Sequence, residues 1–190
     1  MTYNVFDNVT FTFKLLKLNG LMLVTPKDFV DARGSFEESY KFSEFSRNDI
    51  NYYFKQDNIS VSKKGVLRGL HYQLKPNEQG KIVKVLNGEI FDVAVDIRKG
   101  SKTYGKWIGV RLSGKNGQEL FIPPGFAHGF VALKDRTRVL YKVTNEYSPR
   151  MQRGIIWDDP KIGIKWPVKD PIITEKDRKL PSLDDAENNF

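Results

Sequence analysis

The chain has 190 residues, and its 31 Lys and Arg against 23 Asp and Glu leave a formal net charge of +8. This length favours one domain, and a hydrophobic content of 39% is enough for a packed core, which excludes disorder as the main state. The absence of cysteine excludes disulfides, thiolate nucleophiles and Cys-ligated zinc. No apolar run approaches the ~20 residues of a membrane span, and the start, MTYNVFDNVTFTFK, lacks a signal-peptide pattern, so we expect a soluble, cytoplasmic protein.

The positive charge favours an anionic partner, which leaves nucleic acid, anionic lipid and phosphorylated small molecules as classes. Lys and Arg form no dense run, because Lys63-Lys64 and the stretch 176–179 are short and diluted. A basic surface without any partner is an equal alternative at this point.

Short apolar segments separated by turn signals follow one another from about residue 53 onward. Strands are predicted at 53–62, 65–74, 81–86, 89–97, 107–112, 119–122, 128–133 and 139–144. Asn87-Gly88 is typical of a type I′ turn and predicts a hairpin between 81–86 and 89–97. The loop SGKNGQ suggests a second hairpin, between 107–112 and 119–122. Apolar residues alternate with polar ones in 89–97, which predicts a half-buried strand.

Helical signals are weak. One short helix is expected at 43–48 with Ser43 as N-cap, and another at 174–179. There Thr174 and Asp177 have the spacing of a capping box, in which Asp177 reaches back to the N-cap amide. Many short strands with few helices predict an all-β jelly-roll sandwich or barrel. We expect a single domain over 1–190, with an N-terminal arm at about 1–24 and a C-terminal tail at about 182–190 that is mobile or docks on a partner subunit.

The two histidines are the first candidates for chemistry. His71 lies in LRGLHYQ and His128 in PPGFAHGF, both beside glycines that allow close backbone approach. Two histidines supply at most half of a tetrahedral zinc site, so we expect no metal. Acid–base work suits them better, because imidazole titrates near neutrality. A structural role for each histidine is the alternative.

Polar residues further upstream are candidate ligand contacts. Arg33, Glu37 and Glu38 lie in DARGSFEESY, and in a strand the two glutamates point to opposite faces. Gln56 and Asn58 share a face and can both offer amides to a ligand. The alternatives are a salt-bridged surface hairpin for the first group and ordinary edge polarity for the second.

Three further candidates are Arg68, Lys81 and Tyr141. Strict alternation puts Arg68 and His71 on opposite faces, and a bulge at Gly69 brings them to the same side. Lys81 begins an amphipathic strand, where a solvated lysine is the alternative. Tyr141 shares its face with apolar neighbours, which favours a core tyrosine.

Eight segments in series carry a family resemblance. The chain resembles the dTDP-4-dehydrorhamnose 3,5-epimerases from about Thr25 to about Pro181, through DARGSFEESY, QDN, VLRGLHYQ, Gly80-Lys81, GEIFDVAVDIRKGSKTYGKW, FIPPGFAHGF, LYKVTNEYSP and WDDPKIGIKWP. The resemblance implies a cupin-type jelly roll, a homodimer, and no metal or organic cofactor. It implies a thymidine-diphosphate-linked 4-keto-6-deoxy sugar as the partner, with no nucleic acid and no membrane.

The resemblance also implies roles for individual residues. His71 matches the general base, Asp177 the carboxylate paired with it, Tyr141 the general acid on the opposite face of the sugar, and Lys81 the cation that stabilises the enolate. Matches to substrate contacts are Arg33, Glu38, Gln56, Asn58, Arg68 and His128, with Tyr147 stacking on the base and Glu146 nearby. Ser35 and Glu37 depart from the pattern, since aromatic residues are common there, and Tyr72 replaces a frequent Phe.

The implied reaction converts dTDP-4-dehydro-6-deoxy-D-glucose into dTDP-4-dehydro-L-rhamnose, a step of dTDP-L-rhamnose biosynthesis. Carbons 3 and 5 flank the ketone, which acidifies their protons, and inversion needs a base on one face and an acid on the other. The alternatives are a 3- or 5-mono-epimerase, a keto-isomerase of the same fold, and a non-catalytic basic cupin.

Overall fold

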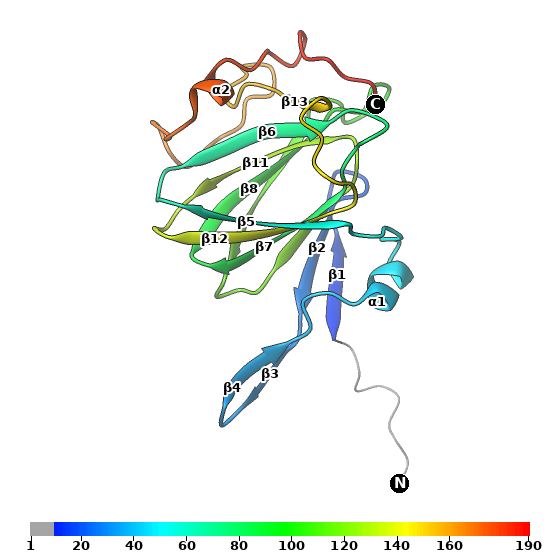
Figure 1. The fold of residues 1–190 in the computed structure, drawn as a ribbon, viewed down its shortest axis with the longest axis vertical. Coiled ribbons are helices and arrows are strands. Elements are labelled where there is room, and N and C mark those ends of the chain that lie inside the picture. Colours follow the sequence, from blue (N-terminus) through cyan, green and yellow to red (C-terminus); the bar gives the residue numbers. More distant parts are fainter. Residues whose placement is uncertain (1–9) are drawn as a thin grey trace.

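Strands are the predominant secondary structure of the computed structural model, which describes residues 10–190. Residues 1–9, the first part of the predicted arm and of the segment inspected for a signal peptide, lie outside that range. The described strands form two stacked antiparallel sheets (Figure 1). One has six strands in the order β1 (Phe11–Leu15), β2 (Met22–Pro26), β10 (Glu119–Ile122), β7 (Lys81–Asn87), β12 (Thr137–Val143) and β5 (Gln56–Ser62).

The second sheet has five strands in the order β13 (Gln152–Gly154), β6 (Leu67–Gln73), β11 (Phe126–Ala132), β8 (Glu89–Asp96) and β9 (Trp107–Ser113). A separate hairpin is formed by β3 (Asp28–Asp31) and β4 (Gly34–Glu37), and the helices are α1 (Phe42–Arg47) and α2 (Glu175–Arg178). Among residues 10–190 no helix has the length and hydropathy needed to cross a membrane. The predicted all-β fold with a few short helices is confirmed.

Both predicted hairpins are wrong, although their strands are present. β7 belongs to the six-stranded sheet and β8 to the five-stranded one, so the chain changes sheets at Gly88, where φ is +87°. β9 and β10 likewise lie in different sheets. An Asn-Gly pair supplies a tight reversal with positive φ, but it does not determine whether the next strand pairs in the same sheet or crosses to the facing one.

The main core lies between the sheets. Its members from the six-stranded sheet are Val83, Val85, Leu120, Ile122 and Val139, and those from the five-stranded sheet are Ile90, Ala94, Leu112, Phe126, Phe130 and Ala132. Such interdigitated apolar side chains are the principal source of stability in a sandwich.

A second core covers the outer face of the five-stranded sheet. Val93 and Val95 of β8 pack there against Ile155, Ile162 and Leu183 from the C-terminal segment. β8 is therefore buried on both faces, and the prediction of a half-buried strand is wrong. The tail packs on its own chain, with Leu183 only 3% exposed.

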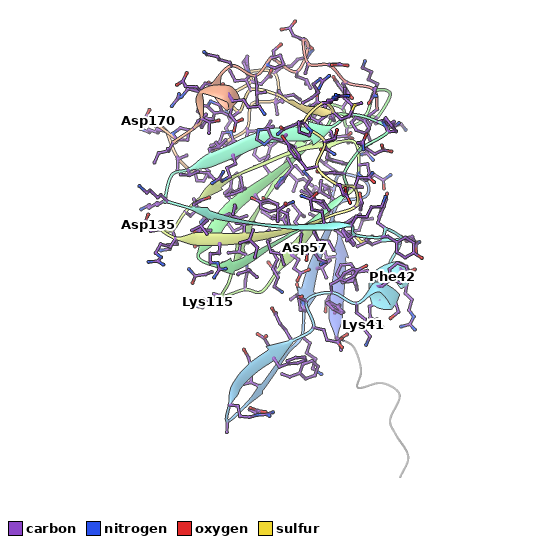
Figure 2. All side chains as sticks on the ribbon, viewed as in Figure 1. Lys41, Phe42, Asp57, Lys115, Asp135 and Asp170 are labelled. Carbon is purple, nitrogen blue, oxygen red and sulfur yellow. The ribbon has the colours of Figure 1, made fainter. Side chains whose placement is uncertain are left out.

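A third core covers part of the outer face of the six-stranded sheet. Phe45 of α1 is fully buried there against Phe11, Ile50 and Phe121. Burial of one such ring contributes about 2–3 kcal/mol, which explains why so short a helix forms. The N-cap is Lys41 without a side-chain cap, so the prediction of Ser43 as N-cap is wrong. Figure 2 shows Lys41 at the start of α1.

The β3–β4 hairpin projects away from the two sheets (Figure 1). Four backbone pairs hold it together, from Asp28 with Glu37 to Asp31 with Gly34. All its strand residues are exposed except Glu37, at the end of β4. The hairpin therefore has little packing of its own against the rest of the chain.

Candidate active site

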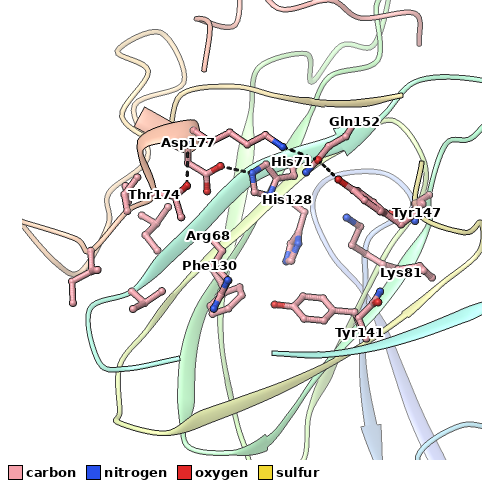
Figure 3. A pocket seen from close by; sticks show the side chains of 18 residues that line it. Arg68, His71, Lys81, His128, Phe130, Tyr141, Tyr147, Gln152, Thr174 and Asp177 are labelled. Atoms are coloured by element: carbon pink, nitrogen blue, oxygen red, sulfur yellow. Dashed lines mark hydrogen bonds and ion pairs between the residues drawn. The ribbon is translucent and has the colours of Figure 1, made fainter. Parts of the chain in front are cut away.

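A cavity of about 650 Å³ opens between the two sheets, beside α2. Its walls come from both sheets, from the loop after β12 and from the segment 172–177 (Figure 3). The predicted site residues that line it are Asn58, Arg68, His71, Lys81, His128, Tyr141, Tyr147 and Asp177. These residues are far apart in the sequence, and the sandwich brings them together.

The wall from the five-stranded sheet depends on an irregularity in β6. His128 pairs with His71 and Phe130 with Arg68, so the register shifts by one residue between these pairs. Gly69 sits at the shift with φ +123°, and a Cβ there would lie 2.5 Å from the Cα of Gly129. The predicted bulge is thus confirmed, and it turns Arg68 and His71 toward the same cavity.

His71 is held by a carboxylate from α2. Its Nε2 lies 2.8 Å from Oδ1 of Asp177, whose side chain is 7% exposed. Burial works against ionisation of Asp177, but the hydrogen bond from His71 keeps its pKa below the usual value. A carboxylate only accepts hydrogen bonds, so Nε2 carries the proton and Nδ1 keeps the lone pair that a base needs.

The local structure of α2 explains why Asp177 is free for this contact. Thr174 caps the helix, its Oγ1 accepting from the backbone amide of Asp177 at 3.2 Å. The carboxylate of Asp177 bonds His71 and the amide of Gly69 (3.5 Å). Only the Thr174 half of the predicted capping box is present, because the carboxylate points into the site.

Tyr141 forms the opposite wall, on the cavity side of β12. Figure 3 shows it across the cavity from His71. Its hydroxyl lies 3.1 Å from Oγ of Ser60, and its ring packs 6.3 Å from that of Phe130. Burial raises the pKa of Tyr141, so the phenol stays protonated and able to donate.

Lys81 projects from β7 into the same space and is 8% exposed. Burial lowers its pKa to about 8, although the carboxylate of Asp92 acts in the opposite direction. The lysine is therefore buried in the cavity wall, and the alternative of a solvated lysine is wrong.

Asp92 is a functional candidate that sequence reasoning missed. It is fully buried, and its Oδ1 lies 2.8 Å from Nε2 of His128, while its Oδ2 is buried without a hydrogen-bond partner in residues 10–190. Burial lowers the pKa of His128 against the effect of Asp92. The sequence offers one signal: an Asp inside the strand EIFDVAVDI, where alternation assigned it to solvent.

The predicted nucleotide contacts divide into two groups. Arg68, Asn58 and Tyr147 line the cavity, and Gln56 supports them by donating to Asn58 (2.7 Å) and accepting from the amide of Tyr147 (2.8 Å). Glu146 is absent from the cavity wall.

Arg33 and Glu38 do not reach the cavity of their own chain. Arg33 is exposed on the hairpin and pairs with Asp31, and Glu38 lies 3.6 Å from Lys41. The β3–β4 hairpin, which carries Arg33 and directly precedes Glu38, extends away from both sheets (Figure 1), so the role of the two residues as substrate contacts stays a prediction.

Two more polar residues, Gln152 of β13 and Lys176 of α2, line the mouth of the cavity. The hydroxyl of Tyr147 and Nζ of Lys176 both donate to Oε1 of Gln152, at 2.7 and 3.0 Å (Figure 3). Lys176 appears in the sequence only as part of a diluted basic stretch, and no local pattern marks Gln152. Within the described part of the chain no cluster of three or more His, Cys, Asp or Glu is arranged to hold a metal.

The fold and the site define a class: a double-sheet β protein that holds an imidazole–carboxylate pair opposite a phenol in one cavity, an arrangement suited to proton transfer at two faces of a bound molecule. The family model of dTDP-4-dehydrorhamnose 3,5-epimerase matches residues 15–185. The chain belongs to this family.

Individual relatives agree with the family match. A dTDP-4-dehydrorhamnose 3,5-epimerase of Methanothermobacter thermautotrophicus is 53% identical over 176 residues, covering 91% of this chain and 95% of the relative. The crystal structure of the Sulfolobus tokodaii enzyme matches with TM-score 0.89 and 48% identity, covering 95% of this chain and 99% of that one. The Legionella pneumophila enzyme, solved in complex with dTDP-4-keto-L-rhamnose, matches with TM-score 0.88 and 43% identity, covering 92% and 93%.

Proposed function

We propose that the protein epimerises dTDP-4-dehydro-6-deoxy-D-glucose at carbons 3 and 5 to dTDP-4-dehydro-L-rhamnose, as a cytoplasmic step of dTDP-L-rhamnose biosynthesis. The observation that carries the proposal is the placement of His71 and Tyr141 on facing sheets of one cavity of about 650 Å³. A planar enolate bound between them has a base on one side and an acid on the other, which is what inversion at carbon requires.

The first step is removal of a proton next to the ketone. Nδ1 of His71 takes the proton, and the C–H electron pair moves into the C–C bond while the carbonyl pair moves onto oxygen. Asp177 orients the imidazole and stabilises the imidazolium that forms. Lys81 places a positive charge where the enolate oxygen becomes negative, an interaction stronger in the transition state than in the ground state.

The second step returns a proton from the other face. The Tyr141 hydroxyl donates to the carbon, the enolate collapses back to the ketone, and the configuration is inverted. His71 and Tyr141 then exchange protons with water to restore the starting state. The same pair serves both carbons after the sugar shifts, so the overall change is an isomerisation without gain or loss of electrons.

The remaining cavity residues suit the nucleotide. Arg68 can bind the diphosphate through charge-assisted hydrogen bonds. Tyr147, which is 50% exposed at the mouth, offers a ring face to the base. A few placed cations are sufficient for this ligand, so the net charge of +8 needs no nucleic-acid partner.

Isotope exchange tests the proposal. The purified protein is incubated with dTDP-4-dehydro-6-deoxy-D-glucose in deuterium oxide, and the product is followed by NMR. We expect deuterium at both carbons together with inversion. Label at a single carbon shows a mono-epimerase, and binding of dTDP without any exchange shows a non-catalytic cupin. His71→Ala should abolish exchange, whereas Tyr141→Phe should exchange with retention, since its far face lacks the acid.

We also infer a homodimer in which each protomer completes the other's nucleotide site. Arg33 and Glu38 match substrate contacts of the family, but Arg33 lies on the β3–β4 hairpin and Glu38 directly after it, and neither lines the cavity of its own chain. A second copy with two-fold symmetry is the simplest source of these groups.

Complementation between inactive variants tests this arrangement. Arg33→Ala and His71→Ala proteins are unfolded together and refolded as a mixture. If Arg33 acts on the neighbouring site, mixed dimers regain one intact site of two, and activity returns to about a quarter of wild type. A mixture as inactive as its components, or a monomer in sedimentation, contradicts the inference.

A further inference from the structure

The direction of the β3–β4 hairpin is set at its base. Within residues 10–190 its strands pair only with each other, and of the residues from 28 to 37 only Glu37 is shielded from solvent. The hairpin carries Arg33 near its tip and precedes Glu38. A small rotation at the base therefore displaces these groups by a larger distance at the tip.

An ion-paired cluster holds that base on the outer face of the six-stranded sheet. Nζ of Lys84, on β7, lies 2.7 Å from Oε1 of Glu37 and 2.7 Å from Oε1 of Glu119 on β10. The side chains of Lys84 and Glu119 are 6% and 1% exposed, and that of Glu37 is 31% exposed. A buried ammonium between two carboxylates exerts a strong, directional hold.

The surroundings make Lys84 the nearest cation for both carboxylates. Lys142 of β12 pairs with Asp57 at 2.9 Å and lies over the ring of Tyr40. Burial raises the pKa of Glu119 to about 7, while Lys84, and more weakly Lys142, oppose the shift and Glu37 adds to it. Oε2 of Glu119 is buried without a hydrogen-bond partner in the described part of the chain. Glu37 is the one member of the cluster that belongs to the hairpin.

Glu37 therefore links the hairpin to Lys84 and, through Lys84, to Glu119 of the sheet. We propose that the Glu37–Lys84 ion pair is a positioning contact that fixes the β3–β4 hairpin and thereby sets the affinity of the protein for the nucleotide of its substrate. This inference rests on the proposed function.

The test uses Glu37→Gln, which keeps the size of the side chain and removes its charge. The matched control is Glu89→Gln, because Glu89 is 26% exposed and pairs with Arg111 at 2.8 Å, away from the hairpin and the cavity. Three measurements are compared in the full-length protein: deuterium exchange of the hairpin amides, calorimetry for the Kd of dTDP, and steady-state kinetics for kcat and KM of the sugar nucleotide.

In Glu37→Gln we expect hairpin exchange about tenfold faster, and Kd and KM raised about tenfold, a change of about 1.4 kcal/mol, with kcat within twofold. The Glu89→Gln control should match wild type in all three. Unchanged exchange overturns the positioning contact, and faster exchange with unchanged Kd overturns its link to binding. Wild-type protein that neither binds dTDP nor turns over the sugar refutes the proposed function, while the exchange comparison still decides whether Glu37 holds the hairpin.

Discussion

The lowered pKa of Lys81 predicts an alkaline limit on catalysis. Burial brings the pKa to about 8, so the ammonium is about half charged at pH 8 and about one-tenth charged at pH 9, against ~97% for an ordinary lysine at pH 9. If the charged form stabilises the enolate, kcat/KM should fall about tenfold per pH unit above pH 8. Since kcat/KM reports the free enzyme, binding of the anionic substrate does not mask the transition.

Two other ionisable groups near Lys81, Tyr141 and His128, do not change their charge in the alkaline part of this profile. Burial raises the pKa of Tyr141, so its phenol remains protonated, and burial lowers the pKa of His128, which is already neutral. The assay is a pH series from 6 to 10 in deuterium oxide and in water, with circular dichroism at each pH to show that the fold persists.

Two substitutions separate charge from packing. Lys81→Arg carries a guanidinium that stays charged throughout this range, and it should remove the alkaline fall even if its maximal rate is lower. Lys81→Met should lower kcat about 10²- to 10³-fold at all pH values, as expected when one electrostatic contact to an oxyanion is lost. A wild-type profile that is flat up to pH 9.5 refutes the assignment of Lys81 as the cation that stabilises the enolate.

Three further outcomes follow from individual contacts. Asp177→Asn should lower kcat about 10²- to 10⁴-fold and leave the Kd for dTDP within twofold, because it loses the partner of His71 and no nucleotide contact. Because burial raises the pKa of Glu119 to about 7, its protonated form adds to the free energy of unfolding, and the full contribution is present below pH ~4.5. Up to about 3 kcal/mol of this free energy is lost as pH rises through 7. Urea unfolding should show this loss in wild type and not in Glu119→Gln. Leu183→Ala should lower the free energy of unfolding by about 2–4 kcal/mol, measured by calorimetry, and leave kcat unchanged in an NMR turnover assay. If the tail were mobile, the substitution would leave the free energy of unfolding unchanged.

Local sequence patterns predicted the strands better than their partners. Short apolar segments between turn signals located β5 to β12, because both signals are local properties of the chain. Which sheet a strand joins depends on long-range packing, so Gly88 was read as a hairpin turn when it is a crossover between sheets. The burial of β8 on both faces depends on a C-terminal segment far away in the sequence, including Leu183.

The site shows the same division. Arg68 and His71 are near neighbours in the chain, and the short spacing across Gly69 was enough to anticipate the bulge. Asp92 and His128 come from adjacent strands whose register no local pattern reveals. Arg33 could be matched to a contact by resemblance, but no short-range rule indicates that its hairpin leaves its own cavity.

The crossover between sheets at Gly88 determines the surroundings of Lys81. Because the chain changes sheets at Gly88, Lys81 and Asp92 belong to different sheets; Lys81 lines the cavity, and Asp92 is buried close enough to act on its pKa. Burial alone disfavours a charged lysine, and the Asp92 carboxylate partly offsets that cost. Lys81 is thus charged at neutral pH yet poorly solvated, and if it stabilises the enolate as proposed, the oxygen gains more from it than from a lysine in water. A hairpin at the same turn would place both residues in one sheet, and the facing sheet would no longer supply the carboxylate that acts on Lys81.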